Sequence, residues 1–322
     1  MKAIIVSKYG SPGVLRVQEV KDPVPKEGDM LIRIKATVAA DPDCAFRSGK
    51  PFISRFFTGL TKPKVIPGDV FAGVVEQPGG SAFQLGDRVY GSSGTNFGTN
   101  AEWIALSAAE AVARMPQNLT FEEAAAVSEG SLTALPFLRD HAQLKKGQRV
   151  LINGAAGGVG VCAVQLAKYY GAVVTAVCGP DNLEFVKGLG ADSVIDYTKE
   201  DFTKRENAYD VIFDAVGKST FGKCKAALTS SGIYLTTVPT PGAMVAMMFT
   251  SKSKGKRGTF AATGLRKPAE KKKDLDMLRG LIEQGRLKAV IGRSFDLAQM
   301  ADAHRYVETG HKRGSASVRV SC

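Results

Sequence analysis

Short apolar runs separated by glycine and proline dominate the first 110 residues. Runs such as KAIIV, DMLIRIKATV and FAGVVE have the length of β-strands, and turn-forming residues lie between them. Closely spaced strands with turn signals predict a β-rich, barrel-like unit. A helix is expected to begin in TFEEAAAV at 120–127, where Thr120 is the predicted N-cap and Glu123 completes a capping box.

The pattern changes near residue 125, where apolar strands begin to alternate with helical segments. Continuous apolar strands separated by helices predict a parallel sheet that is covered on both faces, as in a doubly wound α/β domain. We expect helices at 158–170 and 181–189, and strands at 149–153, 173–178, 193–197, 210–216 and 232–238, the last of which ends the series.

The end of the chain returns to short β-like pieces after a long predicted helix at 268–285. These pieces, KAVIGRSF and SASVRV, are expected to complete the β-rich unit. The pattern therefore predicts two domains. One is β-rich and spans 1–122 with 288–322, and the other is an α/β domain at 123–287.

Composition places the 322 residues among ordinary globular proteins, with 44% hydrophobic and 23% charged residues. No apolar run approaches the roughly 18–20 residues that a membrane span requires, and the first residues do not resemble a signal peptide. A cytoplasmic protein is therefore expected. The five cysteines are scattered and the three histidines form no cluster, which argues against a disulfide framework and a four-cysteine zinc site.

The net charge of +12 is concentrated in two basic stretches, KSKGKR at 252–257 and KKK at 271–273. Such runs are usually solvated loop and helix surface. The alternative is attraction of polyanionic ligands, namely a dinucleotide phosphate, RNA or an acidic membrane. The nucleic-acid interpretation is the weakest, because no aromatic residue interleaves with KSKGKR.

A glycine-rich turn, GAAGGVG at 154–160, connects a predicted strand to a predicted helix. In this context the turn predicts a dinucleotide-binding site. Gly157 would allow the backbone to approach a pyrophosphate, and Gly160 would allow the helix to pack closely on the strand. The N–H groups of Gly158 and Val159 would point at the phosphates from the helix N-terminus, where the peptide dipoles favour an anion.

The second strand of this unit ends in Val177-Cys178-Gly179-Pro180, without the acidic residue that NAD-binding proteins usually carry there. Asp181 is instead predicted to cap the next helix, with Glu184 completing a capping box. A neutral strand end leaves space for a 2′-phosphate, so NADPH is preferred to NADH. Nearby donors are Asn182, Lys187, Tyr197 and Lys199.

These features together resemble the medium-chain dehydrogenase/reductase superfamily, and within it the zinc-free, quinone-oxidoreductase-like branch. The resemblance implies a GroES-like catalytic domain at 1–122 with 288–322 and a Rossmann dinucleotide-binding domain at 123–287. The matching motifs are IPGDVFAGVVE (66–76), GDRVYG (86–91), EEAAAVSEGSLTAL (122–135), INGAAGGVGVCAVQLAK (152–168), LGADSVIDY (189–197), YDVIFDAVG (209–217) and DAHRYVETGHKRGSASV (302–318).

The resemblance also bears on zinc. Zinc-dependent members place a Cys, a His-Glu pair and a later Cys or Asp around the metal, whereas here Asp69 stands where the His is expected. Cys44 and Asp69 alone cannot complete a site of three protein ligands and a water. No metal is therefore expected, and the implied acceptors are already electrophilic: quinones, enones and 2-alkenals.

The family roles carry over to residues that match its motifs. Ala156, Gly157, Gly158 and Val159 are expected to hold the pyrophosphate, and Thr133 to lie near the nicotinamide ribose. The adenosine side of the cofactor and the remaining cofactor contacts are assigned to Cys178, Gly179, Asn182, Tyr197, Val216, Gly217, Val238 and Lys312.

Three departures from the family pattern concern the catalytic site. Ala40 and Asp41 stand where many relatives have a substrate-facing Asn. Two roles stay open for Asp41 and Asp43, participation in the catalytic site and turn formation. Glu129 stands where relatives are apolar or small, and is either a carboxylate near the nicotinamide or an exposed helix-end residue. An aromatic insert at 47–64 carries Phe52, Phe56 and Phe57, which could line a substrate cleft, pack as a loop or contact a partner.

We therefore expect an NADPH-dependent, zinc-independent reductase of quinones or α,β-unsaturated carbonyl compounds. Two alternatives stay open: a metal-free alcohol or aldehyde oxidoreductase, and a low-turnover dinucleotide-binding protein with RNA or membrane contacts. The family resemblance also implies a homodimer, for which GIYLTTV at 232–238 is a candidate edge strand.

Overall fold

The computed structural model describes residues 1–321, which divide by their contacts into two compact units. Unit 1 contains 1–129, 264–285 and the residues from 289 onward, and unit 2 contains 130–263 and 286–288. The boundary falls within one helix, α3 (Phe121–Pro136). The expected capping box is confirmed there, since Thr120 Oγ1 accepts a bond from the Glu123 N–H and Glu123 Oε2 accepts one from the Thr120 N–H.

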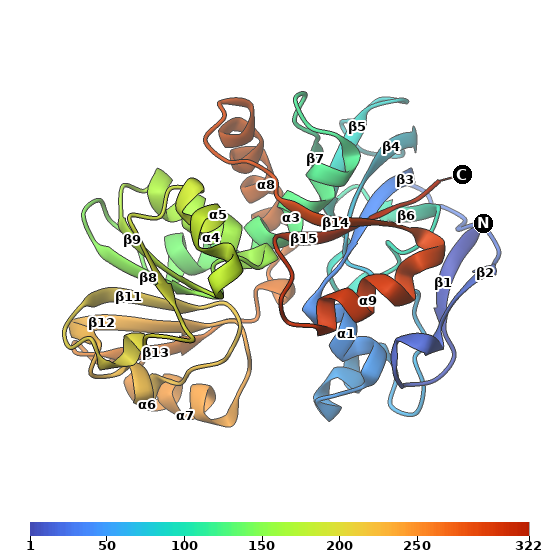
Figure 1. Ribbon diagram of the computed structural model, residues 1–322. Helices are drawn as coiled ribbons and strands as arrows, with labels where there is room; N and C mark the ends of the chain where they lie inside the picture. Colours follow the sequence, from blue (N-terminus) through green and yellow to red (C-terminus); the bar gives the residue numbers. More distant parts are fainter. Residues whose placement is uncertain (322) are drawn as a thin grey trace. The chain divides into compact units, whose positions relative to one another are not determined.

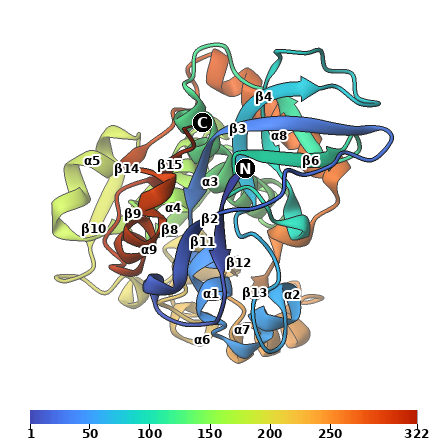
Figure 2. The same cartoon turned by 90° about the vertical axis from the view of Figure 1, so that its right-hand side faces the viewer.

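Unit 1 is built on a seven-stranded sheet with the order β14-β15-β3-β4-β5-β7, in which β6 pairs with β3. Figure 2 shows β3 and β6 side by side. A separate antiparallel pair is formed by the first two strands. The strands are β1 (Lys2–Val6), β2 (Leu15–Glu19), β3 (Asp29–Ala39), β4 (Val70–Gln77), β5 (Arg88–Ser92), β6 (Trp103–Ser107), β7 (Ala111–Arg114), β14 (Ile291–Asp296) and β15 (Ser315–Arg319).

The alternation of apolar and polar residues in β3 explains its position in the middle of this sheet. Met30, Ile32 and Ile34 are fully buried, whereas the residues between them are half-buried. Every second side chain therefore points into the core. The C-terminal β15 pairs antiparallel with β3, which confirms that the end of the chain completes the β-rich unit.

The helices of unit 1 are α1 (Asp41–Ser48), α2 (Arg55–Thr58), α8 (Pro268–Glu283) and α9 (Met300–Glu308). The sequence pattern places 268–285 in the α/β domain, whereas α8 packs on β5 and β7 in unit 1. Its buried face repeats at helical spacing, with Lys271, Leu275, Leu278 and Ile282.

Unit 2 holds a six-stranded parallel sheet with the order β10-β9-β8-β11-β12-β13. The chain enters at the centre, at β8, and moves outward first to one edge and then to the other. This order is that of the Rossmann fold, and it leaves a topological switch point between β8 and β11. The strands are β8 (Arg149–Asn153), β9 (Val173–Cys178), β10 (Ser193–Asp196), β11 (Tyr209–Asp214), β12 (Leu228–Thr236) and β13 (Arg257–Phe260).

Helices lie on both faces of this sheet, as the continuous apolar strands predict. Figure 1 shows α4 and α5 on one face and α6 and α7 on the other. The helices are α4 (Gly158–Tyr169), α5 (Leu183–Gly188), α6 (Phe221–Cys224) and α7 (Pro241–Thr250). The architecture is therefore a Rossmann-type sheet and a β-rich unit.

Two expectations about unit 2 are wrong. The strand series does not end at 232–238, because α7 and β13 follow it. GIYLTTV is also not an edge strand, since β12 lies between β11 and β13. Both errors arise because the segment after β12 has weak sequence signals. The Met-rich residues 241–250 show no strong polar–apolar alternation, and the strand that follows them has only four residues.

Within residues 1–321 the structure contains no helix with the length and apolar character needed to cross a bilayer.

Candidate functional site

The glycine-rich turn of unit 2 is fixed by backbone hydrogen bonds at the carboxyl end of β8. The N–H groups of Gly154 and Ala155 both donate to the Val177 carbonyl oxygen, at 3.1 and 3.0 Å. Gly154 has φ +82°, a left-handed conformation that favours glycine. These bonds tie the turn to β9. The first N–H groups of α4, which follows the turn, have no intrahelical partners, as at every helix start.

Two glycines of the turn have different structural roles. A Cβ on Gly160 would lie 2.1 Å from the Gly154 carbonyl oxygen, so the helix can pack this closely on the turn only without a side chain. A Cβ on Gly157 would meet no atom nearer than 3.6 Å. Packing within the chain therefore does not require glycine at Gly157, whereas the close approach of a ligand to the backbone would.

The loop after β11 lies against this turn. A Cβ on Gly154 would come within 2.3 Å of the Val216 side chain, and a Cβ on Gly217 within 2.4 Å of the Val238 side chain. The structure thus brings Val216, Gly217 and Val238 together with the glycine turn at the carboxyl ends of β8, β11 and β12. This edge, next to the switch point, is where ligands bind in open α/β sheets.

The loop is organised by Asp214, a fully buried residue that the sequence analysis did not identify. Its carboxylate accepts bonds from the N–H groups of the following loop and from the Asn153 amide and the Tyr234 hydroxyl; the loop donors are Val216 (3.3 Å), Gly217 (3.0 Å) and Ser219 (2.8 Å). The signal available in the sequence is a charged residue at the end of an otherwise apolar strand, VIFD.

The carboxyl ends of β9 and β10 hold the residues assigned to the adenosine side. The Tyr197 N–H donates to the Cys178 carbonyl oxygen at 3.3 Å, and a Cβ on Gly179 would touch the Tyr197 ring at 3.5 Å. Tyr197 is 55% exposed, so its hydroxyl is accessible. The Cys178 thiol is buried, and burial together with Asp196 raises its pKa to about 11. Cys178 can therefore contribute backbone contacts but no thiolate at neutral pH.

The predicted cap of the next helix is wrong in position. Helix α5 begins at Leu183, with Asn182 at the N-cap and without a hydrogen bond from that side chain to the helix. Asp181 lies in the preceding 3₁₀ turn, Pro180–Asn182. With Pro180 at its start, this turn occupies the predicted cap, and the helix start lies one residue after the position that the capping-box pattern indicates.

Thr133 lies on the face of α3 that meets the start of α4. A Cβ on Gly130 would lie 2.3 Å from the Gly158 carbonyl oxygen, so α3 and α4 are in close contact there. Residues three apart share a helix face, which places Thr133 on the Gly130 side of α3.

Unit 1 gathers Asp41, Asp43, Glu129 and Lys312, four residues that we call the acidic cluster. Lys312 Nζ donates to Asp41 Oδ2 at 2.8 Å, and the Lys312 side chain is only 10% exposed. Burial lowers the pKa of Lys312, but the charges of Asp41 and Glu129 outweigh burial and raise it. Lys312 therefore carries its positive charge among carboxyl groups that lie far apart in the sequence.

Glu129 is half-buried within α3, so the exposed helix-end interpretation is wrong. Burial raises its pKa, and the repulsion from Asp41 and Asp69 adds to this effect, whereas Lys312 and a hydrogen bond with Ser315 lower it. The net direction is upward. A carboxyl group of this kind holds a proton at a higher pH than an exposed glutamate.

Asp43 is a buried turn-forming residue at the start of α1. Its Oδ2 accepts the Ala40 N–H at 2.9 Å, which is the backbone half of a capping box. Burial raises the pKa of Asp43 to about 7, with further repulsion from Asp69 and Glu129. Asp43 thus positions the loop at Ala40 and Asp41 and is itself poorly placed to meet a substrate.

The aromatic insert is largely exposed. Phe52 and Phe56 are 61% and 67% exposed and meet edge to face with ring centres 6.0 Å apart. Phe57 packs on Phe46 at 6.1 Å. Phe56 is therefore an accessible apolar side chain of unit 1, which leaves its assignment to the substrate as a prediction.

The residues that would have to hold zinc are engaged in other bonds. The Cys44 thiol lies 3.4 Å from His304 Nδ1, and burial raises the pKa of Cys44 to about 12. Asp69 Oδ1 accepts bonds from the Ser92 hydroxyl at 2.5 Å and the Gly94 N–H at 2.7 Å. Over residues 1–321 no group of three or more His, Cys, Asp or Glu side chains could hold a metal ion. The donor set thus does not fit a zinc site.

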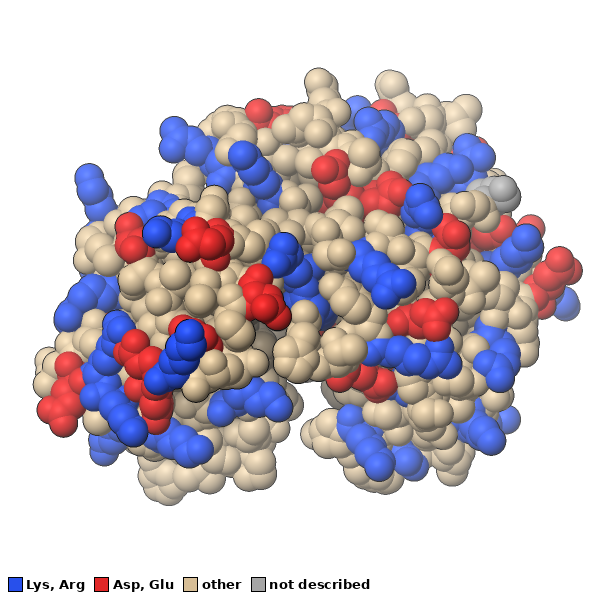
Figure 3. Space-filling view, in the orientation of Figure 1, with Lys and Arg blue, Asp and Glu red and all other residues tan. Residues whose placement is uncertain are grey.

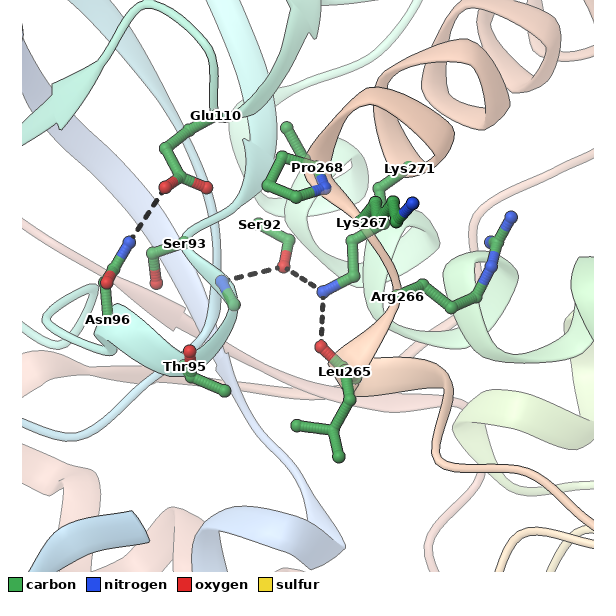
Figure 4. A pocket seen from close by; sticks show the side chains of 13 residues that line it. Ser92, Ser93, Thr95, Asn96, Glu110, Leu265, Arg266, Lys267, Pro268 and Lys271 are labelled. Carbon is green, nitrogen blue, oxygen red and sulfur yellow. Dashed lines mark hydrogen bonds between the residues drawn. The ribbon is translucent and has the colours of Figure 1, made fainter.

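A cavity of about 340 Å³ in unit 1 has Ser92 and Lys271 in its wall (Figure 4). Lys271 is only 4% exposed; its Nζ donates to the Gly264 carbonyl oxygen at 2.8 Å and to Ser92 Oγ at 3.3 Å. Ser92 in turn donates to Asp69, so one hydroxyl bridges two buried charges. The interpretation of 271–273 as plain surface is wrong for Lys271. The signal in the sequence is the helical spacing of Lys271 from Leu275 and Leu278, which places it on the buried face of α8.

Comparisons with known proteins agree with this geometry. Residues 26–136 match the alcohol dehydrogenase GroES-like domain family, and residues 189–316 match a family described as zinc-binding dehydrogenase. The chain is 34% identical to 2-methylene-furan-3-one reductase of Solanum lycopersicum, over 99% of this chain and 79% of that protein. It is 32% identical to a chloroplastic NADPH-dependent alkenal/one oxidoreductase of Arabidopsis thaliana, with the same coverage of 99% and 79%.

The fold matches a solved structure over the whole chain. Escherichia coli quinone oxidoreductase complexed with NADPH superposes with a TM-score of 0.86 at 25% identity, covering 99% of this chain and 100% of that one. The chain therefore belongs to the medium-chain dehydrogenase/reductase superfamily, in its quinone-oxidoreductase-like branch, as an NAD(P)H-dependent enzyme of the quinone and enone reductase type.

Proposed function

We propose that this protein is an NADPH-dependent, zinc-independent reductase that transfers hydride to quinones or α,β-unsaturated carbonyl compounds. The observation that carries the proposal is the open space at Gly157, where the chain itself does not need a glycine. The printed names of the relatives supply the substrate class, since they include a furanone reductase, an alkenal/one oxidoreductase and a quinone oxidoreductase.

The residues of unit 2 fit a dinucleotide. The N–H groups at the start of α4 would hold the pyrophosphate, while Val216, Gly217 and Val238 offer an apolar wall beside the turn. Bound NADPH would supply the hydride. The preference for the phosphorylated coenzyme is supported by the accessible Tyr197 and by the lack of an acidic residue at the end of β9.

The acidic cluster supplies the groups for proton handling in the proposed reaction. A conjugated carbonyl compound that accepts a hydride becomes an enolate, and a quinone becomes a hydroquinone anion; both then need a proton. Glu129 holds a proton at higher pH than an ordinary glutamate, which suits a proton donor. Lys312, fixed by Asp41, stabilises negative charge next to it.

Zinc independence is supported by the donor set. The Cys44 thiol stays protonated in its contact with His304, and Asp69 is engaged with Ser92 and Gly94. A zinc ligand must be deprotonated and free to coordinate. A homodimer and a cytoplasmic location also stay predictions; sedimentation velocity and fractionation of cells would test them.

Purified protein with NADPH and a panel of quinones, enones, alkenals and matched saturated aldehydes tests the function. We expect turnover of the conjugated acceptors and none of the saturated controls. Turnover of saturated aldehydes at a comparable rate would favour a metal-free alcohol or aldehyde oxidoreductase. Coenzyme binding without turnover of any acceptor would favour a low-turnover binding protein, and stoichiometric zinc in active protein would contradict zinc independence.

The pH profile tests the proposed role of Glu129. Lys312 lowers the pKa of Glu129, so Lys312→Met should raise that pKa further. If protonated Glu129 is needed, activity falls as pH rises through its pKa, and this fall should move to higher pH in the variant. Glu129→Gln cannot donate a proton, so it should be slow at every pH and show no such fall. Identical profiles for the three proteins would contradict the assignment.

A further inference from the structure

The charge of the protein is very unevenly distributed along unit 2. Residues 215–263 contain no Asp or Glu, yet they carry seven basic residues. These are Lys218, Lys223, Lys225, Lys252, Lys254, Lys256 and Arg257. A stretch of this length without an acidic residue cannot balance its charge by ion pairs within itself.

The same stretch contains a helix with an uncovered apolar face. In α7, Met244, Val245, Met248 and Phe249 are 55%, 50%, 69% and 78% exposed. Positions i, i+1, i+4 and i+5 lie on one side of a helix, so these four side chains form one surface, which we call the α7 patch. Large contiguous apolar surfaces on a soluble protein usually mark a site of interaction.

The opposite side of α7 is held by the sheet, which fixes the direction of the patch. A Cβ on Gly258 of β13 would lie 3.0 Å from the Ala246 Cβ and 3.0 Å from the Phe221 ring. Thr250 Oγ1 accepts the Gly258 N–H at 2.8 Å. The helix is therefore clamped between β13 and α6, and the α7 patch points away from the core.

Basic residues lie after the C-terminal end of α7 and at the end of α6, which contacts α7. Lys256 Nζ donates to the Lys225 carbonyl oxygen at 2.7 Å, which joins the run after α7 to the end of α6. Lys252 and Lys254 follow the helix directly and are exposed, as are Lys223 and Lys225. In Figure 3 the lower-left surface, over α6 and α7, is mostly tan, with blue and some red side chains beside it.

We propose that the α7 patch and the basic residues around it dock unit 2 onto an anionic lipid membrane. The Met, Val and Phe side chains would enter the boundary between headgroups and acyl chains, and the lysines would meet anionic headgroups. Apolar burial and electrostatic attraction both act in this arrangement, whereas neither a short helix nor a basic run binds a bilayer stably by itself.

Charge favours a lipid surface over a second copy of this chain. In a two-fold symmetric dimer formed through α7 the same surface meets itself. The seven basic residues of one copy would then find no acidic partner among residues 215–263 of the other, whereas an anionic membrane offers negative charge to both. RNA is disfavoured because the exposed side chains of the patch are mainly aliphatic, with one aromatic ring for stacking.

Vesicle co-sedimentation tests the proposal on the full chain. The probes are vesicles of phosphatidylcholine alone and vesicles of phosphatidylcholine mixed with phosphatidylserine, an anionic lipid of the cytoplasmic leaflet. We expect binding to the anionic vesicles that weakens as salt rises, and little binding to phosphatidylcholine. Met248→Ser/Phe249→Ser should weaken binding at least about tenfold through lost apolar burial. Lys252→Gln/Lys254→Gln should weaken it by a similar factor and reduce its salt dependence.

Matched variants in unit 1 serve as controls. Val24→Ser/Leu85→Ser replaces two apolar residues that are 87% and 69% exposed, and Lys21→Gln/Lys273→Gln removes two exposed lysines. All four proteins should keep the melting temperature of the wild type, and the two controls should bind vesicles like the wild type. This comparison does not use the reductase assay, so the vesicle-binding result can be interpreted even if the protein shows no reductase activity.

Four results would overturn the proposal. The first is equal binding to both kinds of vesicle, and the second is binding that the α7 and lysine variants leave unchanged. The third is a sedimentation-velocity shift from dimer to monomer in Met248→Ser/Phe249→Ser without any loss of vesicle binding, which would assign the patch to a second copy. Tight binding of a single-stranded RNA that competes with vesicles at the same lysines would assign the surface to nucleic acid.

Discussion

The glycine turn of unit 2 and the acidic cluster of unit 1 are built from different parts of the chain. The turn uses backbone N–H groups and missing Cβ atoms within seven consecutive residues, 154–160. The acidic cluster uses side chains from Asp41, Glu129 and Lys312, which only the fold brings together. A backbone site should therefore respond to added atoms and to loss of its supports, whereas a side-chain site should respond to changes of charge.

The largest expected effect concerns Asp214, the side chain that organises the loop beside the glycine turn. Asp214→Ala removes the acceptor of five hydrogen bonds in a buried place. Each stranded buried donor costs about 1–3 kcal/mol, so the free energy of unfolding should fall by at least about 5 kcal/mol. Urea denaturation measures it. Asp210→Ala, on the same strand but half-buried, should cost less than about 2 kcal/mol, and equal losses would show that Asp214 has no special role.

Asp43 of the acidic cluster should make the free energy of unfolding depend on pH. The pKa of Asp43 rises from 3.8 to about 7 in the folded protein, so folding favours its protonated form. This contribution to stability is complete below pH 4 and is lost as pH rises to 7. Since one pKa unit corresponds to about 1.4 kcal/mol, the loss is at most about 4 kcal/mol.

Asp43→Asn separates this titration from the structural bond. The amide oxygen of the variant can still accept the Ala40 N–H, but the side chain does not ionise. The difference in free energy of unfolding between wild type and variant should therefore change between pH 4 and 7, with the wild type losing stability relative to the variant. A difference that is constant over this range would contradict the buried environment of Asp43.

Alanine substitutions at two glycines of the turn should separate folding from binding. Gly157→Ala has room for its Cβ and should leave the melting temperature unchanged, while coenzyme affinity falls about tenfold or more because the methyl group occupies the ligand's approach. Gly160→Ala should instead lose about 1–3 kcal/mol of stability, since its Cβ meets the Gly154 carbonyl oxygen. Calorimetric titration with the coenzyme measures the affinity, and thermal melts measure the stability. Similar losses of stability and of coenzyme affinity in both variants would contradict this separation of folding from binding.

The same contrast explains what the sequence could predict. The Rossmann-type sheet, the start of α4 and the role of Gly160 follow from short-range patterns, because strand periodicity and turn chemistry are local. The Lys271–Ser92–Asp69 chain and the contact of Asp41 with Lys312 were beyond prediction from residue patterns, because their members are up to 271 residues apart. The helix and strand at 241–260 were not predicted for another reason: an exposed Met-rich helix breaks the rule that apolar residues are buried.

The smallest expected effect lies at the end of β9 and β10, where backbone and side chain act together. Tyr197 packs its ring on Gly179 and keeps an accessible hydroxyl. If that hydroxyl donates to the 2′-phosphate, Tyr197→Phe should weaken NADPH binding about fivefold, the value of one hydrogen bond of about 1 kcal/mol, and leave NADH binding unchanged. The ring remains in the variant, so stability should not change. Equal weakening of both coenzymes would show that Tyr197 acts through its ring alone, and the preference for NADPH would then rest on the lysines nearby.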